Sequence, residues 1–169
     1  MMPVELHDAV VTLRPWTLQD APWYVECTMD PEVQRFTTDP PTLTAEDVAA
    51  AISALAVHPE RLAYLVADRA SGQRLGNLAL DRADDVGDVS YWIAAAARGR
   101  GVATRALELL AAAAFEHLDL RKLRLWAHAA NTASRRVAER AGFRRDPARD
   151  QTRAIKGETW PTVAYVRLR

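Results

Sequence analysis

Apolar and polar residues alternate in three stretches of the chain with the period of two that a half-buried β-strand requires. These stretches are Val10–Arg14, Lys122–His128 and Thr162–Arg167. Pro15 ends the first of them, because proline cannot donate to a strand ladder. Leu62–Ala67 is instead apolar at almost every position, which predicts a strand buried on both faces.

Two more strands are predicted directly after Leu62–Ala67. They are Leu75–Leu80 and Val86–Ile93, and turn residues precede each of them, Ser71-Gly72 and Ala83–Asp85. Since tight turns join antiparallel neighbours, the three consecutive strands predict an antiparallel meander.

Two helices are predicted between the first strand and the meander. Each opens with a threonine followed three residues later by an acid, a pattern typical of a capping box: Thr17–Asp20 and Thr44–Asp47. The first helix runs to about Met29 and stops at Pro31. The second carries an apolar stripe and ends at Pro59.

The remaining segments are less regular. Glu32–Pro41 contains paired prolines and is predicted to be a loop. Asn131–Ala141 is predicted to be a short helix, with Gly142 as its left-handed C-terminal cap. Phe143–Asp146 begins another strand, and the polar stretch Pro147–Gly157 receives no assignment.

A long alanine-rich helix is predicted after Gly101. Because it joins the strand Val86–Ile93 to the strand Lys122–His128, residues 86–128 predict a parallel strand–helix–strand crossover. The buried side of this helix is expected to carry apolar residues at helical spacing: Ala103, Ala106, Leu107, Leu110, Ala114 and Leu118.

The loop before this helix has the features of an anion site. The first N–H groups of a helix lack internal partners and carry partial positive charge, so they bind phosphate well. Gly99 and Gly101 let the backbone approach an anion closely, and Arg98 and Arg100 add charge-assisted donors.

Two common phosphate-binding motifs do not fit this loop. A P-loop is excluded because no Lys-Ser or Lys-Thr follows Gly101. The dinucleotide fingerprint G-x-G-x-x-G is also absent, because Ala103 and Thr104 follow instead. A Rossmann-like nucleotide protein is kept as a minor alternative, which stabilisation by NAD or ATP in a thermal shift would support.

Composition limits the range of functions. The chain has 169 residues, which suits a single domain over 1–169, and its 22 basic residues equal its 22 acidic ones. This balance predicts no direct nucleic-acid binding and no membrane association. The lone Cys27 excludes an internal disulfide and a cysteine zinc cage, so we expect no metal and a reducing, cytoplasmic location. The N-terminus, with Glu5 and Asp8, does not have the pattern of a signal peptide.

Two motifs together resemble the GNAT superfamily of N-acetyltransferases. Arg98–Ala103 matches [Q/R]-x-x-G-x-[G/A], the acetyl-CoA pyrophosphate loop of that family. Asn131–Phe143 matches N-x-x-S-x-x-V-x-E-x-x-G-F, and Leu13–Trp16 followed by Asp20 looks similar as well. These features resemble the branch of ribosomal-protein serine/alanine N-terminal acetyltransferases, and the resemblance covers nearly the whole chain.

The resemblance implies an α/β fold with a mixed sheet of about six to seven strands and about four helices. In that family the fourth and fifth strands splay apart, and acetyl-CoA lies in the gap. The cofactor residues carried over are Trp92, Ile93, Arg98, Gly99, Arg100, Gly101, Val102, Ala103, Thr104, Asn131 and Ser134. The Ile93 N–H is expected to donate to the thioester carbonyl, which develops negative charge as an amine attacks.

The general acid carried over from the family is Ser134. In many relatives a tyrosine seven residues after the asparagine protonates the departing thiolate, but that position here is Ala138. In the serine branch the hydroxyl lies three residues after Asn131, which is Ser134. The alternative is that Ser134 only solvates the first turn of a helix.

The sequence does not identify a single residue as the general base. Alanine-specific relatives carry a glutamate five residues before the asparagine, whereas this chain has Trp126. His128 and Asp88 are the candidates, with Glu26 and His58 behind them, and water is a further alternative. A site without a strong base favours an α-amine over lysine, because an α-amine loses its proton more readily.

The resemblance implies a primary amine as acceptor, either a protein N-terminus or a small molecule. Trp23 and Tyr24 are candidates for the acceptor groove, because the family builds it partly from the first two helices. The family's aspartate before the last strand is replaced by Trp160–Thr162. Homodimers are common in this branch, which is implied by resemblance only.

The sequence is compatible with two functions of different classes. The leading one is an acetyl-CoA-dependent N-acetyltransferase. The alternative is a non-catalytic acyl-CoA-binding sensor on the same fold, which would tolerate Ala138 and Trp126. Turnover of amines by the wild type and by Ser134→Ala distinguishes them.

Overall fold

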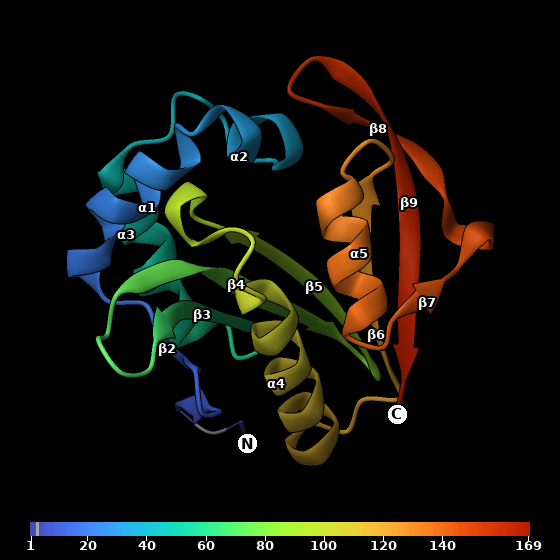
Figure 1. Ribbon diagram of the computed structural model, residues 1–169, viewed down its shortest axis with the longest axis horizontal. Coiled ribbons are helices and arrows are strands. Elements are labelled where there is room, and N and C mark those ends of the chain that lie inside the picture. The colour runs from blue at the N-terminus through green and yellow to red at the C-terminus, as the bar shows by residue number, and fades with distance from the viewer. Residues whose placement is uncertain (3) are drawn as a thin grey trace.

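A single mixed β-sheet forms the centre of the protein (Figure 1). The computed structural model describes residues 1–2 and 4–169. In this described part nine strands pair in the order β1-β2-β3-β4-β5-β6-β9-β7, with β8 paired to β9. The strands are β1 (Leu6–His7), β2 (Val11–Pro15), β3 (Arg61–Asp68), β4 (Arg74–Ala83), β5 (Val86–Ile93), β6 (Lys122–His128), β7 (Arg144–Arg145), β8 (Gln151–Ile155) and β9 (Glu158–Leu168).

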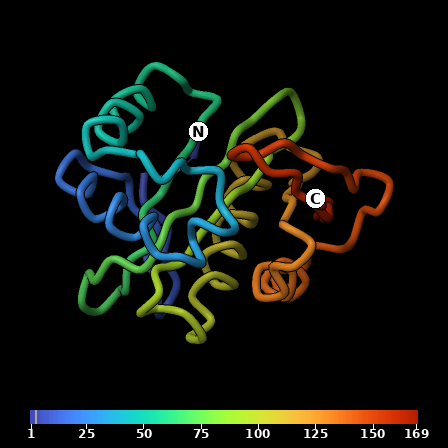
Figure 2. Tube along the Cα trace, turned by 90° about the horizontal axis from the view of Figure 1, so that it is seen from above, coloured from blue at the N-terminus to red at the C-terminus, as the bar shows by residue number. Residues whose placement is uncertain are grey.

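Helices cover both faces of the sheet. They are α1 (Ala21–Thr28), α2 (Pro31–Phe36), α3 (Ala45–Ala54), α4 (Val102–His117) and α5 (Thr132–Arg140), with short 3₁₀ turns η1 (Leu18–Asp20), η2 (Leu55–Val57), η3 (Ala95–Ala97) and η4 (Pro147–Arg149). Tyr64 and Val66 of β3 pack in the same cluster as α4, whereas Leu65 and Ala67 pack with α1 and α2. Figure 2 shows α1 and α3 (blue and cyan) well apart from α5 (orange).

The predicted chain order is confirmed. β3, β4 and β5 form an antiparallel meander, and β6 pairs with β5 in parallel after the crossover through α4. Gly142 has the left-handed φ of 82° expected at the end of α5. Threonine and aspartate form a capping box at both predicted helix starts, Thr17 with Asp20 and Thr44 with Asp47.

Three segments differ from the sequence-based expectation. Glu32–Pro41 was predicted to be a loop, but its first part belongs to α2: the Asp30 side chain accepts from the N–H groups of Glu32 and Val33, and Pro31 occupies the first helical position. The pair Asp-Pro thus ends one helix and begins the next, which proline's fixed φ permits. The unassigned polar stretch forms η4 and β8, and β1 adds an edge, so the sheet exceeds the expected six to seven strands.

The β8–β9 hairpin reaches across to α2 (Figure 1). Lys156 at its tip has a positive φ of 50°, and Gly157 follows with φ 77°. The Lys156 ammonium donates to the backbone carbonyls of Gln34 and Asp39. Two segments more than 110 residues apart in sequence therefore meet above the open end of β5 and β6.

Candidate functional site

A cleft opens between β5 and β6 because the two strands pair only at one end. The parallel register links Val86 to Lys122, Gly87 to Leu123 and Asp88 to Arg124, and it stops there although both strands continue. Gly87 leaves room for a side chain of β6 at the paired end, since a Cβ there would lie 2.7 Å from Leu123 Cδ2. The cleft encloses about 820 Å³.

The backbone of β5 presents donors to this cleft. Ala94 N donates to Leu75 O of the neighbouring β4. Because alternate residues of a strand direct their N–H groups to opposite sides, the N–H of Ile93 points away from β4 and toward the gap. Ile93 and Trp92 both line the cleft.

The glycine-containing loop lies at one end of the cleft. Gly99 and Gly101 have φ of 73° and 72°, a left-handed conformation that favours glycine, and a Cβ at either would meet nothing within 4 Å. Gly101 is the N-cap of α4 and provides no side-chain cap. Within the described chain, no protein acceptor bonds the N–H groups of Gly101, Val102 and Ala103. These amides therefore face open space at a helix N-terminus, where anions bind.

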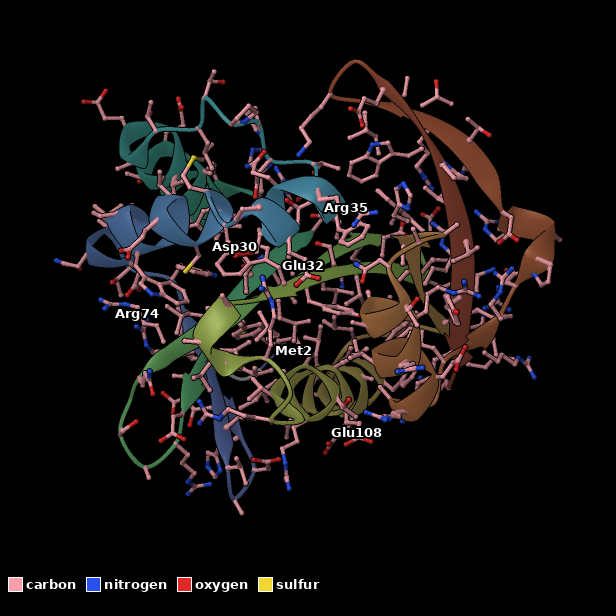
Figure 3. All side chains as sticks on the ribbon, turned by 45° about the horizontal axis from the view of Figure 1, so that its top comes forward. Met2, Asp30, Glu32, Arg35, Arg74 and Glu108 are labelled. Atoms are coloured by element: carbon pink, nitrogen blue, oxygen red, sulfur yellow. The ribbon has the colours of Figure 1, made fainter. Side chains whose placement is uncertain are left out.

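The two arginines of this loop behave differently. Arg98 forms ion pairs with Asp30 at 2.7 Å and with Glu32 at 3.1 Å, so its guanidinium ties the loop to the first turn of α2. Figure 3 labels both acids beside the loop. Arg100 forms no ion pair within residues 1–2 and 4–169. Arg98 therefore has to leave, or share, its acidic partners before it contacts an anion.

Two further arginines line the cleft that the motifs did not single out. Arg136 and Arg140 lie four residues apart on α5, so they share one face of that helix. Neither forms an ion pair in the part of the chain that the structure describes. Their i,i+4 spacing within the second motif is the sequence feature that could have indicated that both arginines lie on one face of the helix.

Asn131 and Ser134 lie together at the start of α5. Asn131 Oδ1 accepts from Ser134 N at 3.1 Å, which makes Asn131 the N-cap of the helix. Both residues line the cleft. The Ser134 hydroxyl is 3.0 Å from the phenol oxygen of Tyr91 on β5. Burial raises the pKa of Tyr91 to about 12, so its phenol keeps its proton at neutral pH.

Aromatic side chains surround the other end of the cleft. Tyr24 stands edge-on to Trp16 at 5.3 Å and to Trp92 at 5.1 Å between ring centroids. Its hydroxyl donates to Asp39 Oδ2 at 2.8 Å. Burial and the nearby Asp39 charge raise the pKa of Tyr24, so this phenol stays protonated as well. Tyr24 and Asp39 line the cleft, whereas Trp23 supports Trp92 from behind and is not part of the lining.

The four base candidates lie in different places. Asp88 forms a bidentate pair with Arg124 at the closed end of the strands and does not line the cleft. His128 packs between Phe36 and Trp160, and its Nδ1 accepts from Ala130 N.

Of the two remaining candidates, only one reaches the cleft. Glu26 is exposed on α1 and is not part of the cleft lining, whereas His58 lines the cleft and pairs with Glu60. The positions that hold the acid and base of other relatives, Ala138 and Trp126, are respectively fully buried and part of the cleft wall.

No metal or membrane element is visible in the described residues. Histidine, cysteine and acidic side chains of residues 1–2 and 4–169 form no group of three that could hold a metal ion. Over the same residues, every helix is too short or too polar to cross a bilayer.

Known proteins share this architecture. A family model described as an acetyltransferase (GNAT) domain matches residues 11–144. YdaF of Bacillus subtilis strain 168, named provisionally as a ribosomal N-acetyltransferase, is 39% identical over 64 residues. That match spans 38% of this chain and about a third, 35%, of the relative's length.

Solved structures align over nearly the whole chain. RimJ of Mycobacterium smegmatis in complex with CoA-disulfide has a TM-score of 0.83 at 19% identity, covering 98% of this chain and 88% of that one. A Salmonella typhimurium acetyl transferase that modifies the N-terminal serine of the 50S protein L7/L12 has a TM-score of 0.83 at 18% identity, covering 99% and 98%. At these identities the similarity establishes the fold.

Proposed function

The chain belongs to the GNAT acetyltransferase family, and on this premise we propose that it transfers the acetyl group of acetyl-CoA to a protein N-terminal α-amine. The observation that carries the proposal is the geometry of the cleft: an uncapped helix N-terminus at one end opens directly onto the unpaired ends of two parallel strands. A small-molecule primary amine is the second acceptor class.

The cosubstrate fits the residues that line the cleft. Acetyl-CoA supplies the acetyl group as an activated thioester. The free amides of Gly101–Ala103 would hold its diphosphate, and Arg136 and Arg140 would face its remaining negative charge. The unpaired backbone of β5 would contact the amide groups of its arm.

The chain's own groups then stabilise the reaction. The N–H of Ile93 points into the gap, where it can donate to the oxygen on which negative charge develops. Such a donor typically contributes about 3 kcal/mol to the barrier reduction. Ser134 would protonate the leaving sulfur, since among the described residues of α5 that line the cleft it alone carries a hydroxyl. His58 and Asp39 are described cleft-lining groups that can accept a proton, so one of them, or water, would remove the proton of the amine.

The acceptor would enter from the aromatic end of the cleft. A protonated amine is attracted by the Asp39 carboxylate and by the faces of Tyr24 and Trp92. The preference for a protein N-terminus comes from the relatives whose names describe that activity. An α-amine, with a pKa of about 8, also needs a weaker base than a lysine amine does.

Turnover of a panel of acceptors tests the proposal. The purified protein is incubated with acetyl-CoA and with peptides that begin with serine or alanine, their N-terminally blocked counterparts, and a polyamine, and free CoA thiol is measured. We expect release of thiol with the free peptides and none with the blocked ones. Tight acetyl-CoA binding without turnover of any amine would favour the sensor function instead.

A further inference from the structure

A phenol from the sheet meets the first turn of α5 inside the cleft. Tyr91 lies on β5, one residue before Trp92, and its side chain points to the face that packs against α4 and α5. Its Oη is 2.9 Å from Ser134 O and 3.0 Å from Ser134 Oγ. Both residues line the cleft in which the proposed cosubstrate would lie.

Ser134 on its own is a weak proton donor. A serine hydroxyl that loses its proton becomes an alkoxide, which is more basic than the thiolate it serves, so the transfer is unfavourable unless another group replaces the proton at once. Ala138, which stands where many relatives have a tyrosine, is fully buried and has no polar side-chain atom. The other polar side chains of α5 that line the cleft are Arg136 and Arg140, whose guanidinium groups do not release a proton at neutral pH, so a second proton donor has to come from another element or from water.

We propose that Tyr91 is the positioning and relay residue that makes Ser134 an acid for the leaving thiolate. As the carbon–sulfur bond breaks, the sulfur takes the proton of Ser134 Oγ and Ser134 Oγ takes the proton of Tyr91 Oη. Water then returns a proton to the phenolate. The inference rests on the proposed acetyl transfer and adds the residue that completes its acid.

The hydrogen-bond geometry allows both states of this relay. The phenol has one proton and two acceptors within reach on the same residue. When it donates to Ser134 O, the serine hydroxyl can donate back to Tyr91. When it donates to Ser134 Oγ, the serine proton is free to point at the sulfur. Because Asn131 caps the Ser134 N–H, the serine backbone stays in place during the exchange.

A double-mutant cycle tests the relay. We compare the wild type with Tyr91→Phe, Ser134→Ala and the double variant, measuring kcat and the KM for acetyl-CoA. We expect Tyr91→Phe to lower kcat about 10- to 100-fold with the KM changed less than about twofold. We expect the double variant to be no slower than Ser134→Ala, because both substitutions interrupt one path.

Tyr165→Phe is the matched control. Tyr165 is a buried phenol that also contacts α5, through Arg135 and Glu139, and it does not line the cleft. The Tyr165→Phe variant should lose as much stability as the Tyr91→Phe variant but keep the wild-type kcat. The relay is wrong if Tyr91→Phe also keeps wild-type kcat, or if the two single losses multiply in the double variant. Absence of turnover in the wild type itself would remove the proposed function and the relay with it.

Discussion

Asp39 places a carboxylate in the cleft that the sequence did not single out. It lies in the turn after α2, where the sequence predicted only a loop, and no motif marks it. Its carboxylate accepts a hydrogen bond from the Tyr24 hydroxyl and lines the aromatic end of the cleft. The sequence could not reveal it, because Tyr24 and Asp39 meet only once α1 and the following loop fold over the sheet.

Asp39→Asn is expected to raise the KM for a peptide amine about tenfold and to leave the KM for acetyl-CoA unchanged. The reason is the loss of one negative charge opposite an ammonium, and tenfold corresponds to about 1.4 kcal/mol. Steady-state kinetics with each substrate varied in turn gives both constants. Glu46→Gln, an exposed acid on α3 outside the cleft, should change neither.

Arg136→Ala is expected to raise the KM for acetyl-CoA about 5- to 20-fold. A charge-assisted hydrogen bond to a phosphate contributes about 1.5–3 kcal/mol, and solvent around this exposed side chain reduces that contribution. The amine KM should stay constant. Arg149→Ala removes an equally exposed arginine from η4, away from the cleft, and serves as the control. Equal effects of the two variants would mean that only the general charge of this face matters.

At the scale of elements, the helix starts and the crossover could be predicted, and the splay could not. Thr17 and Thr44 carry their capping partners within four residues, so local sequence decides these helix starts. Pro31 was misread because the same residue can follow one helix and open another. After Asp88, β6 parts from β5 but stays paired with β9 as far as His128, and these three strands lie far apart in the sequence. Only the resemblance to a family predicted it.

Gly101→Ala tests whether the start of α4 needs an open backbone. A left-handed alanine costs about 1–2 kcal/mol of stability, and the added methyl group would face the space assigned to the diphosphate. We therefore expect a lower melting temperature and a raised KM for acetyl-CoA.

Gly142→Ala is the control for Gly101→Ala. Its φ of 82° gives similar backbone strain at the end of α5, outside the cleft, so it should lower the melting temperature alone. If both variants raised the KM equally, general destabilisation would explain the effect.

At the scale of the molecule, Asp20 joins η1 to two strands. Its side chain is 1% exposed and accepts hydrogen bonds from Arg14 of β2, from Arg74 of β4 and from the Thr17 backbone. Burial alone would raise its pKa, but these donors outweigh burial and hold the pKa well below the usual range. The stabilisation is therefore complete above the unfolded-state pKa of about 4 and is lost as the pH falls toward the folded-state value.

Asp20→Asn is expected to lower the free energy of unfolding at pH 7 by about 2 kcal/mol, because an amide NH₂ replaces one buried carboxylate oxygen that accepts hydrogen bonds, and the partly exposed Arg14 and Arg74 lose their charge partner. Urea denaturation from pH 7 to pH 2 measures the difference from the wild type, which should shrink below about pH 4. Asp119→Asn, at a fully exposed side chain, should match the wild type throughout. A difference that stayed constant with pH would contradict the charge argument.

The unpaired ends of β5 and β6 have a consequence for the free protein. Beyond Asp88 and Arg124, each strand has backbone N–H and C=O groups that face the gap and have no partner on the other strand. In the free protein these groups bond to solvent. A ligand whose arm contains amides can form hydrogen bonds with these backbone groups, as a neighbouring strand would. Amide hydrogen exchange at residues 89–93 and 125–128 should then slow when CoA is added, because the ligand would protect backbone groups that the sheet leaves unpaired.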